Sequence, residues 1–126
     1  GRRPASHPPL APAFADALHD FLIYLRVECN MRPATIEAYT RDLRDLLADL
    51  ESRGIRTPAD IATDHLTDHL GRLRSERGME GSSVSRHLAT IRTFFKWLTA
   101  NTRITRDPSA SIDPPTRWKR LPDCLS

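Results

Sequence analysis

The sequence predicts an all-α protein, an antiparallel bundle of four helices. Apolar residues recur at spacings of three and four along four segments, which is the period of one face of an α-helix. Proline and glycine stand at the borders of these segments, and the connections between them are short. No segment shows the two-residue alternation of a half-buried strand, so helices must supply the core of this 126-residue chain.

The first two helices are expected over residues 12–28 and 33–53. The first ends before Pro33, because a proline disfavours the α conformation of the residue that precedes it. Pro33 then opens the second helix, where its missing N–H is tolerated, and Gly54 is expected to close it. The inward positions are those of Phe14, Leu18, Phe21, Leu22 and Leu25 in the first helix, and Ile36, Tyr39, Leu43, Leu46, Leu47 and Leu50 in the second.

The third and fourth helices are expected over residues 64–77 and 82–101. The segment T-P-A-D-I before the third helix is typical of a single turn, and Thr63 is expected to cap the helix that follows. Gly78 ends the third helix, and the fourth begins at Ser82 or Ser83. The inward positions are those of Leu66, Leu70 and Leu73, and then Val84, Leu88, Ile91, Phe95 and Leu98.

Composition places the chain among soluble globular proteins, with 39% hydrophobic and 28% charged residues. No apolar run approaches the ~20 residues that span a bilayer, and the N-terminus lacks the apolar centre of a signal peptide. Cys29 and Cys124 are too few for a disulfide framework, which favours a reducing cytoplasm. The expected unit is therefore one domain, residues 13–112, preceded by a flexible tail over residues 1–12.

Charge is distributed unevenly along the chain. Residues 82–126 carry eight basic and three acidic side chains, whereas residues 13–81 carry nine basic and thirteen acidic ones. A basic C-terminal third on an acidic body indicates one surface that faces an anion, such as nucleic acid. The alternative is a solvated helix face followed by a basic tail.

The fourth helix has a polar face without acidic residues. On a helical wheel, the side opposite the apolar stripe holds Ser82, Arg86, Ala89, Thr93 and Lys96. Small residues let a helix approach a duplex closely, hydroxyls and cations bind phosphates, and arginine also reads guanine edges. The sequence therefore predicts a nucleic-acid contact here, with plain solvent exposure as the alternative.

The second helix offers a different kind of phosphate site. Its first turn has free backbone N–H groups at the positive end of the helix dipole, and Arg32 and Thr35 lie beside it. Thr35 has an alternative role in capping the helix. The later exposed positions alternate in sign, which is typical of a solvated surface; they are Arg41, Asp42, Arg44, Asp45 and Asp49.

No metal site, cofactor site or nucleophile is predicted. His65 and His69 have the i, i+4 spacing of metal ligands, but no third cysteine or histidine is near in sequence, so a solvated helix face is favoured. Tyr24 and Tyr39 fall beside apolar stripes and are interpreted as packing residues. The chain also lacks a glycine-rich phosphate loop.

Three segments of the sequence carry a family resemblance. They are R-P-A-T-I-E-A-Y-T-R-D-L, G-S-S-V-S-R-H-L-A-T-I-R-T-F-F-K-W-L, and D-P-S-A-S-I-D-P-P with R-L-P-D-C-L-S. In this order and spacing the chain resembles, over residues 14–126, the N-terminal core-binding domain of tyrosine recombinases, particularly Xer-type enzymes and phage or transposon integrases. The resemblance implies a SAM-like helical domain that forms half of a C-shaped clamp around DNA.

The resemblance also implies which residues touch DNA, because the second and fourth helices of this domain face the major groove of a recombination half-site. Residues 113–126 then form an extended linker and the start of a catalytic domain. Tyr39 has an alternative place in the core. The matched positions are Arg32, Thr35, Tyr39, Arg41, Ser82, Ser83, Arg86, Thr90, Thr93 and Lys96, with Arg117, Lys119 and Arg120 in the linker.

The expected role is DNA binding during integration or chromosome dimer resolution. The family cleaves and rejoins DNA with a tyrosine in a C-terminal domain outside this sequence, so this chain alone is not expected to be an enzyme. Its expected partners are double-stranded DNA and, for the full-length protein, other protomers of a tetrameric synapse. The isolated domain is expected to be a cytoplasmic, nucleoid-associated monomer with no membrane contact. A helical protein-interaction module without a DNA role is the alternative.

Overall fold

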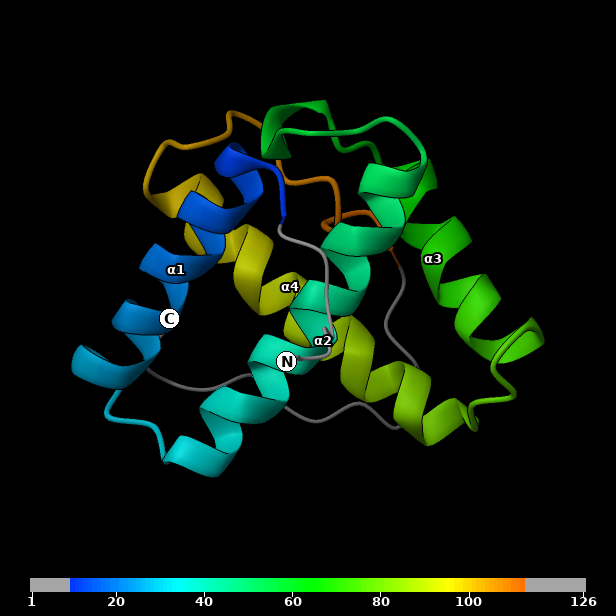
Figure 1. Ribbon diagram of the computed structural model, residues 1–126, viewed down its shortest axis with the longest axis horizontal. Coiled ribbons are helices and arrows are strands. Elements are labelled where there is room, and N and C mark those ends of the chain that lie inside the picture. The colour runs from blue at the N-terminus through cyan, green and yellow to red at the C-terminus, as the bar shows by residue number, and fades with distance from the viewer. Residues whose placement is uncertain (1–9, 113–126) are drawn as a thin grey trace, which may run out of the picture.

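The computed structural model describes residues 10–112, and over that range the chain is all-helical, as predicted (Figure 1). Each helix begins and ends within one or two residues of its expected borders, and consecutive helices run in opposite directions. The T-P-A-D-I segment forms a 3-10 turn. The elements are α1 (Pro12–Val27), α2 (Pro33–Ser52), η1 (Pro58–Asp60), α3 (Thr63–Ser75) and α4 (Gly81–Ala100).

Helices α2 and α4 form the centre of the bundle, and each of them contacts the other three helices. In Figure 1 α4 runs diagonally behind α2, with α1 on one side and α3 on the other. Aromatic side chains fill the junction of α1 and α4: the ring of Phe21 lies 5.2 Å from that of Phe94 and 5.4 Å from that of Trp97. Burial of several such rings is the main stabilising term for a domain of this size.

A residue in the left-handed conformation follows each of the four helices α1 to α4; after α4 it is Thr102, with φ +56°. Gly54 has φ +90° after α2, and Gly78 has φ +65° after α3, which confirms both as helix-ending positions. Asn30, with φ +53°, ends α1 in the same way, and the N–H of Met31 donates to the carbonyl of Leu25. These turns reverse the chain within a few residues and make the antiparallel arrangement possible.

The expected side-chain caps are wrong. Thr63 is the first residue of α3 and donates its hydroxyl to the carbonyl of Pro108 (2.7 Å), while His65 Nδ1 accepts the N–H of Ala62 (2.9 Å). Helix α4 begins one residue earlier than expected, at Gly81, without a side-chain cap. The hydroxyl of Thr63 bonds Pro108 and not its own helix because the chain after α4 folds back onto α3.

The segment that follows α4 is fastened to the bundle. Arg92 on α4 donates to the carbonyls of Ser109 (3.2 Å) and Ile112 (2.9 Å). The carboxylate of Asp107 accepts both the N–H and the hydroxyl of Ser109, and Ile104 is buried in the core. The folded unit therefore continues beyond the last helix to Ile112.

The N-terminal border lies slightly before the expected one. Of the tail expected over residues 1–12, the last three are described: Ala11 is buried and donates its N–H to Glu51, and Pro12 opens α1. The remainder of the tail and the linker expected over residues 113–126 lie outside the described residues. Between residues 10 and 112, no helix is long and apolar enough to cross a membrane.

Candidate nucleic-acid interface

Helices α2 and α4 begin on the same side of the molecule, at the lower edge in Figure 1. Arg32 and Thr35 at the start of α2 are exposed, as is Ser82 at the start of α4, and Ser83 is half-buried. The first N–H groups of a helix have no partner within it, and the helix dipole makes this end positive. Each of these ends, on the same side of the molecule, is suited to binding a phosphate group.

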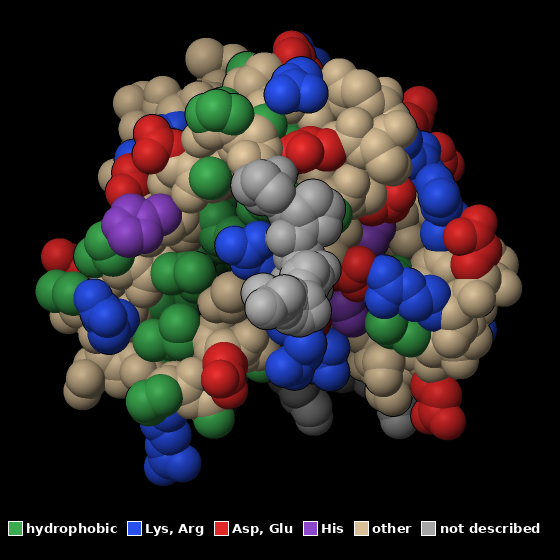
Figure 2. Space-filling view, in the orientation of Figure 1, with side chains coloured by type: hydrophobic (Ala, Val, Ile, Leu, Met, Phe, Trp, Pro, Cys, Tyr) green, Lys and Arg blue, Asp and Glu red, His purple; other side chains and the backbone are tan. Residues whose placement is uncertain are grey.

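A groove of about 820 Å³ runs between α2 and the start of α4. Four arginines and three carboxylates line it, and two of the arginines, Arg77 and Arg86, are ion-paired with Asp45 and Asp42. Arg41 and Arg44 form no ion pair with any described residue, and Arg41 is exposed. Figure 2 shows acidic and basic side chains interspersed on this side of the molecule, so the cations available to an anion are few and local.

Arg86 lies opposite the apolar stripe on the helical wheel, yet its side chain also pairs with a buried residue of α2. Its Nη2 donates to Asp42 Oδ1 (3.0 Å) and its Nε to Asp42 Oδ2 (3.3 Å). The Asp42 side chain is only 3% exposed, whereas that of Arg86 is 52% exposed. A buried carboxylate needs a counter-charge, so Arg86 joins α4 to α2 with one edge of its guanidinium and meets solvent with the rest.

Thr90 and Thr93 are buried, and the predicted exposure of Thr93 is wrong. The hydroxyl of Thr93, 0% exposed, donates to the carbonyl of Ala89, and that of Thr90 donates to the carbonyl of Arg86. A helical wheel assumes one packed face, but α4 is covered by three helices, so its back is also inside. At the far end of the predicted stripe, Lys96 is exposed.

Tyr39 belongs to the packing of the bundle. It is half-buried, its ring lies 6.2 Å from that of Phe21, and a side-chain hydrogen bond joins it to Thr93. Burial, with a smaller contribution from the charge of Asp42, raises the pKa of the Tyr39 hydroxyl, and the bond to Thr93 offsets only part of this. The alternative reading of Tyr39 as a core residue thus agrees with its position.

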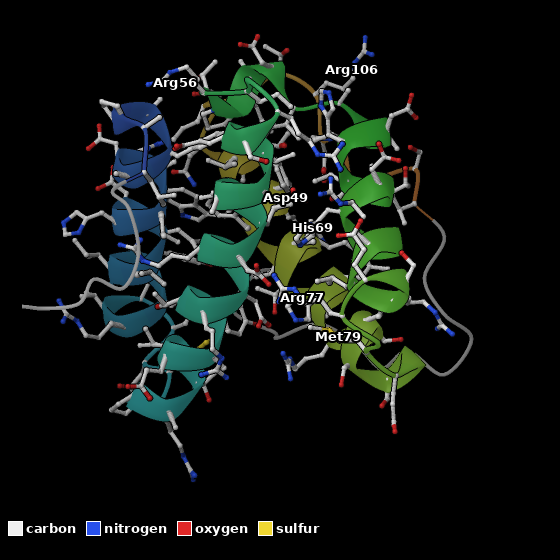
Figure 3. All side chains as sticks on the ribbon, turned by 45° about the vertical axis from the view of Figure 1, so that its right-hand side comes forward. Asp49, Arg56, His69, Arg77, Met79 and Arg106 are labelled. Carbon is white, nitrogen blue, oxygen red and sulfur yellow. The ribbon has the colours of Figure 1, made fainter. Side chains whose placement is uncertain are left out.

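Sequence reasoning missed a polar network between α2 and α3. His69 Nδ1 lies 2.8 Å from Asp49 Oδ2, and both Arg53 and Arg72 lie 3.6 Å from Asp49 Oδ1 (Figure 3). Burial raises the pKa of Asp49, but the bond to His69 and the nearby positive charges outweigh it, and the net pKa is lowered. The available signal was the i, i+3, i+7 spacing of Asp42, Asp45 and Asp49 on one side of α2.

His87, which sequence reasoning did not single out, extends this network to α4. Its imidazole is buried, and its Nε2 lies 3.5 Å from Asp42 Oδ1. Burial lowers the pKa of His87, and although Asp42 acts in the opposite direction, the net shift is downward.

Comparisons with known proteins agree with the helical architecture. Residues 18–102 match the family described as "Phage integrase, N-terminal SAM-like domain". The chain is 31% identical over 112 residues to the tyrosine recombinase XerD of Listeria monocytogenes serotype 4b, with 88% of this chain and 37% of the relative covered. It is 32% identical over 108 residues to the tyrosine recombinase XerC of Pseudomonas syringae pv. syringae, covering 86% and 36%, respectively. No solved structure matches the chain.

Proposed function

We propose, from the premise that this chain belongs to the phage integrase N-terminal SAM-like domain family, that it is the DNA-binding domain of a site-specific tyrosine recombinase. In this proposal residues 13–112 grip one half-site as half of a clamp, and residues 113–126 connect them to a catalytic domain. The chain spans little more than a third of the length of the relatives it matches. Cleavage and rejoining of DNA are assigned to the remainder of the parent protein.

The observation that carries the proposal is that α2 and α4 both begin on the same side of the molecule (Figure 1). Arg32 and Thr35 at one helix start, and Ser82 and Ser83 at the other, supply a guanidinium and hydroxyls beside two positive helix ends. Such groups bind phosphates and fix the register of a protein on a duplex. Both helices then lead from the phosphates toward the groove that Arg41 lines.

The proposed DNA-contacting set is smaller than the sequence indicated. Thr90, Thr93 and Tyr39 pack beneath the surface and are left out of the set. Arg86 is proposed to contact DNA only with the part of its guanidinium that is not paired with Asp42. Arg117, Lys119 and Arg120 remain proposed phosphate contacts beyond the described residues. The parent protein is proposed to act in the bacterial cytoplasm, on DNA, as part of a recombinase tetramer, either in integration or in chromosome dimer resolution.

Binding of duplex DNA by the isolated domain is expected to be weak and steeply dependent on salt. If roughly three to five phosphates are neutralised, log K should fall against log salt concentration with a slope of about −3 to −4.5. Fluorescence anisotropy at several salt concentrations measures this slope. No salt-sensitive binding at low ionic strength would contradict the proposal and favour a protein-interaction module.

The double substitution Arg32→Ala, Arg41→Ala is expected to weaken DNA binding while leaving the fold intact, because both side chains are exposed. Losing two phosphate contacts should make the salt slope shallower by roughly 2. The matched control is Arg56→Ala, Arg106→Ala, which removes the same charge from the opposite end of the bundle (Figure 3). Equal weakening by both pairs would show that net charge, and not this surface, determines binding.

A further inference from the structure

Two buried histidines each have one ring nitrogen without a partner. His69 on α3 is 2% exposed and His87 on α4 is 3% exposed. Among the described residues, neither His69 Nε2 nor His87 Nδ1 has a hydrogen-bond partner. Buried polar atoms of this kind are rare in folded proteins, because leaving one unsatisfied costs about 1–3 kcal/mol.

The opposite nitrogen of each ring faces a carboxylate. His69 Nδ1 lies 2.8 Å from Asp49 Oδ2. His87 Nε2 lies 3.5 Å from Asp42 Oδ1 and 3.3 Å from Arg86 Nη2, which can only donate. The carboxylate behind His69 fixes its tautomer and places the lone pair on Nε2. In His87, a lone pair on Nδ1 requires the proton on Nε2, donated to Asp42, so Arg86 Nη2 must turn away from the ring when a metal binds. Metal-binding histidines in proteins almost always have such a partner.

Asp45 of α2 completes the cluster. Its carboxylate and one nitrogen from each of the two histidines all lie within 4.8 Å of one another. Asp45 Oδ1 is also ion-paired with Arg77, so a metal would share this carboxylate with the guanidinium. Figure 3 shows His69 and Arg77 between α2 and α3. Three helices therefore contribute one ligand atom each.

We propose that Asp45, His69 and His87 form a Zn²⁺ site that joins α2, α3 and α4, with water as the fourth ligand. Two imidazoles and one carboxylate suit Zn²⁺, which binds nitrogen and oxygen ligands in tetrahedral geometry. Zinc–ligand distances of about 2.0–2.2 Å place neighbouring ligand atoms roughly 3.3 Å apart. Small rotations of the three side chains bring the present cluster to that size.

Two grooves border the cluster. Asp45 lines both the 820 Å³ groove and a second groove of about 300 Å³, and His87 lies on the first while His69 lies on the second. Because both unpartnered ring nitrogens are buried, entry of an ion requires local movement of the side chains between them and the grooves. The site is distinct from the i, i+4 pair of α3, because His65 Nδ1 is bound to the N–H of Ala62 and lies outside the cluster.

Zinc titration of the chelator-treated, DNA-free chain tests the proposal. Isothermal titration calorimetry should give one Zn²⁺ per chain, and the melting temperature should rise with Zn²⁺ concentration. Co²⁺ in place of Zn²⁺ should give the visible absorption of a tetrahedral complex. His69→Gln and His87→Gln should each lower the zinc affinity at least 100-fold. Asp49→Asn, which removes only the carboxylate behind His69, should lower it about 10–100-fold.

The matched controls are His65→Gln, on the same helix as His69, and His19→Gln, exposed on α1. Both should retain the wild-type zinc affinity. Absence of zinc binding by the wild-type chain, unchanged affinity in the His69 and His87 variants, or loss of affinity in a control would overturn the proposal.

Imidazole ¹⁵N spectra of the wild-type chain provide a readout that does not depend on folding of the variants. Zinc should shift the resonances of His69 Nε2 and His87 Nδ1. Shifts confined to other histidines, or no shift, would overturn the assignment. None of these measurements involves DNA, so their outcome is independent of the proposed DNA-binding function.

Discussion

Replacing Phe21 with alanine is expected to cost the domain about 3–5 kcal/mol of unfolding free energy. Phe21 is fully buried, and its ring packs against those of Tyr24, Tyr39, Phe94 and Trp97, which come from three helices. Truncation removes the contacts of a whole ring and leaves a cavity that the surrounding helices cannot fill. A domain of this size has only about 5–15 kcal/mol in total, so the variant should be close to unfolded at 37 °C.

Urea denaturation followed by circular dichroism measures the loss. The matched control is Ile23→Ala, two positions along α1, where the side chain is 38% exposed and the expected cost is far smaller. Phe95→Ala and Leu88→Ala on α4 should behave like Phe21→Ala, since both side chains are buried. Equal effects of Phe21→Ala and Ile23→Ala would mean that α1 presents a different face to the core.

Arg86→Ala is expected to destabilise the domain by roughly 3 kcal/mol, the lower end of the range for breaking a buried ion pair. The substitution leaves the carboxylate of Asp42 inside the bundle, with only the hydroxyl of Thr90 and the ring of His87 nearby. We expect a loss of unfolding free energy at the lower end of that range because Arg86 is half-exposed and water can reach Asp42 from the side of Arg86. Arg86→Ala should therefore reduce DNA binding partly by reducing the folded fraction.

A double-mutant cycle separates the charge from the packing. Adding Asp42→Asn to the Arg86→Ala variant removes the uncompensated charge, and part of the lost stability should return. Arg41→Ala is the comparison, because Arg41 lines the same groove without an ion pair to any described residue, and its loss should be close to neutral. If the double variant is less stable than Arg86→Ala by the full cost of Asp42→Asn alone, the two residues do not interact.

The helices of this domain were predictable from sequence, but the burial of polar side chains between them was not. Pro33, Gly54 and Gly78 act through the local backbone, so the borders they set are visible without tertiary information. Burial of Thr93 depends on how many neighbours α4 has, and a helical wheel contains no such information. The helical wheel therefore predicted the apolar stripe correctly, but its prediction that the opposite face is exposed to solvent was wrong at Thr93.

The candidate site shows the same limit. Asp42, Asp45 and Asp49 resemble a solvated stripe in the sequence, because acidic residues at helical spacing are usually exposed. They are drawn inward by Arg86, Arg77 and His69, which come from later parts of the chain. His69 and His87 lie on different helices, so their convergence is a property of the packing and has no sequence motif.

The anchoring of residues 107–112 determines how the domain transmits mechanical load. Arg92 holds the carbonyls of Ser109 and Ile112, and Thr63 holds that of Pro108, so this segment is fixed to α3 and α4. A pull on the chain at Ile112 is borne by Arg92 and passes directly into α4. The twelve residues after α4, 101–112, are therefore tied to the helices and carry load together with them.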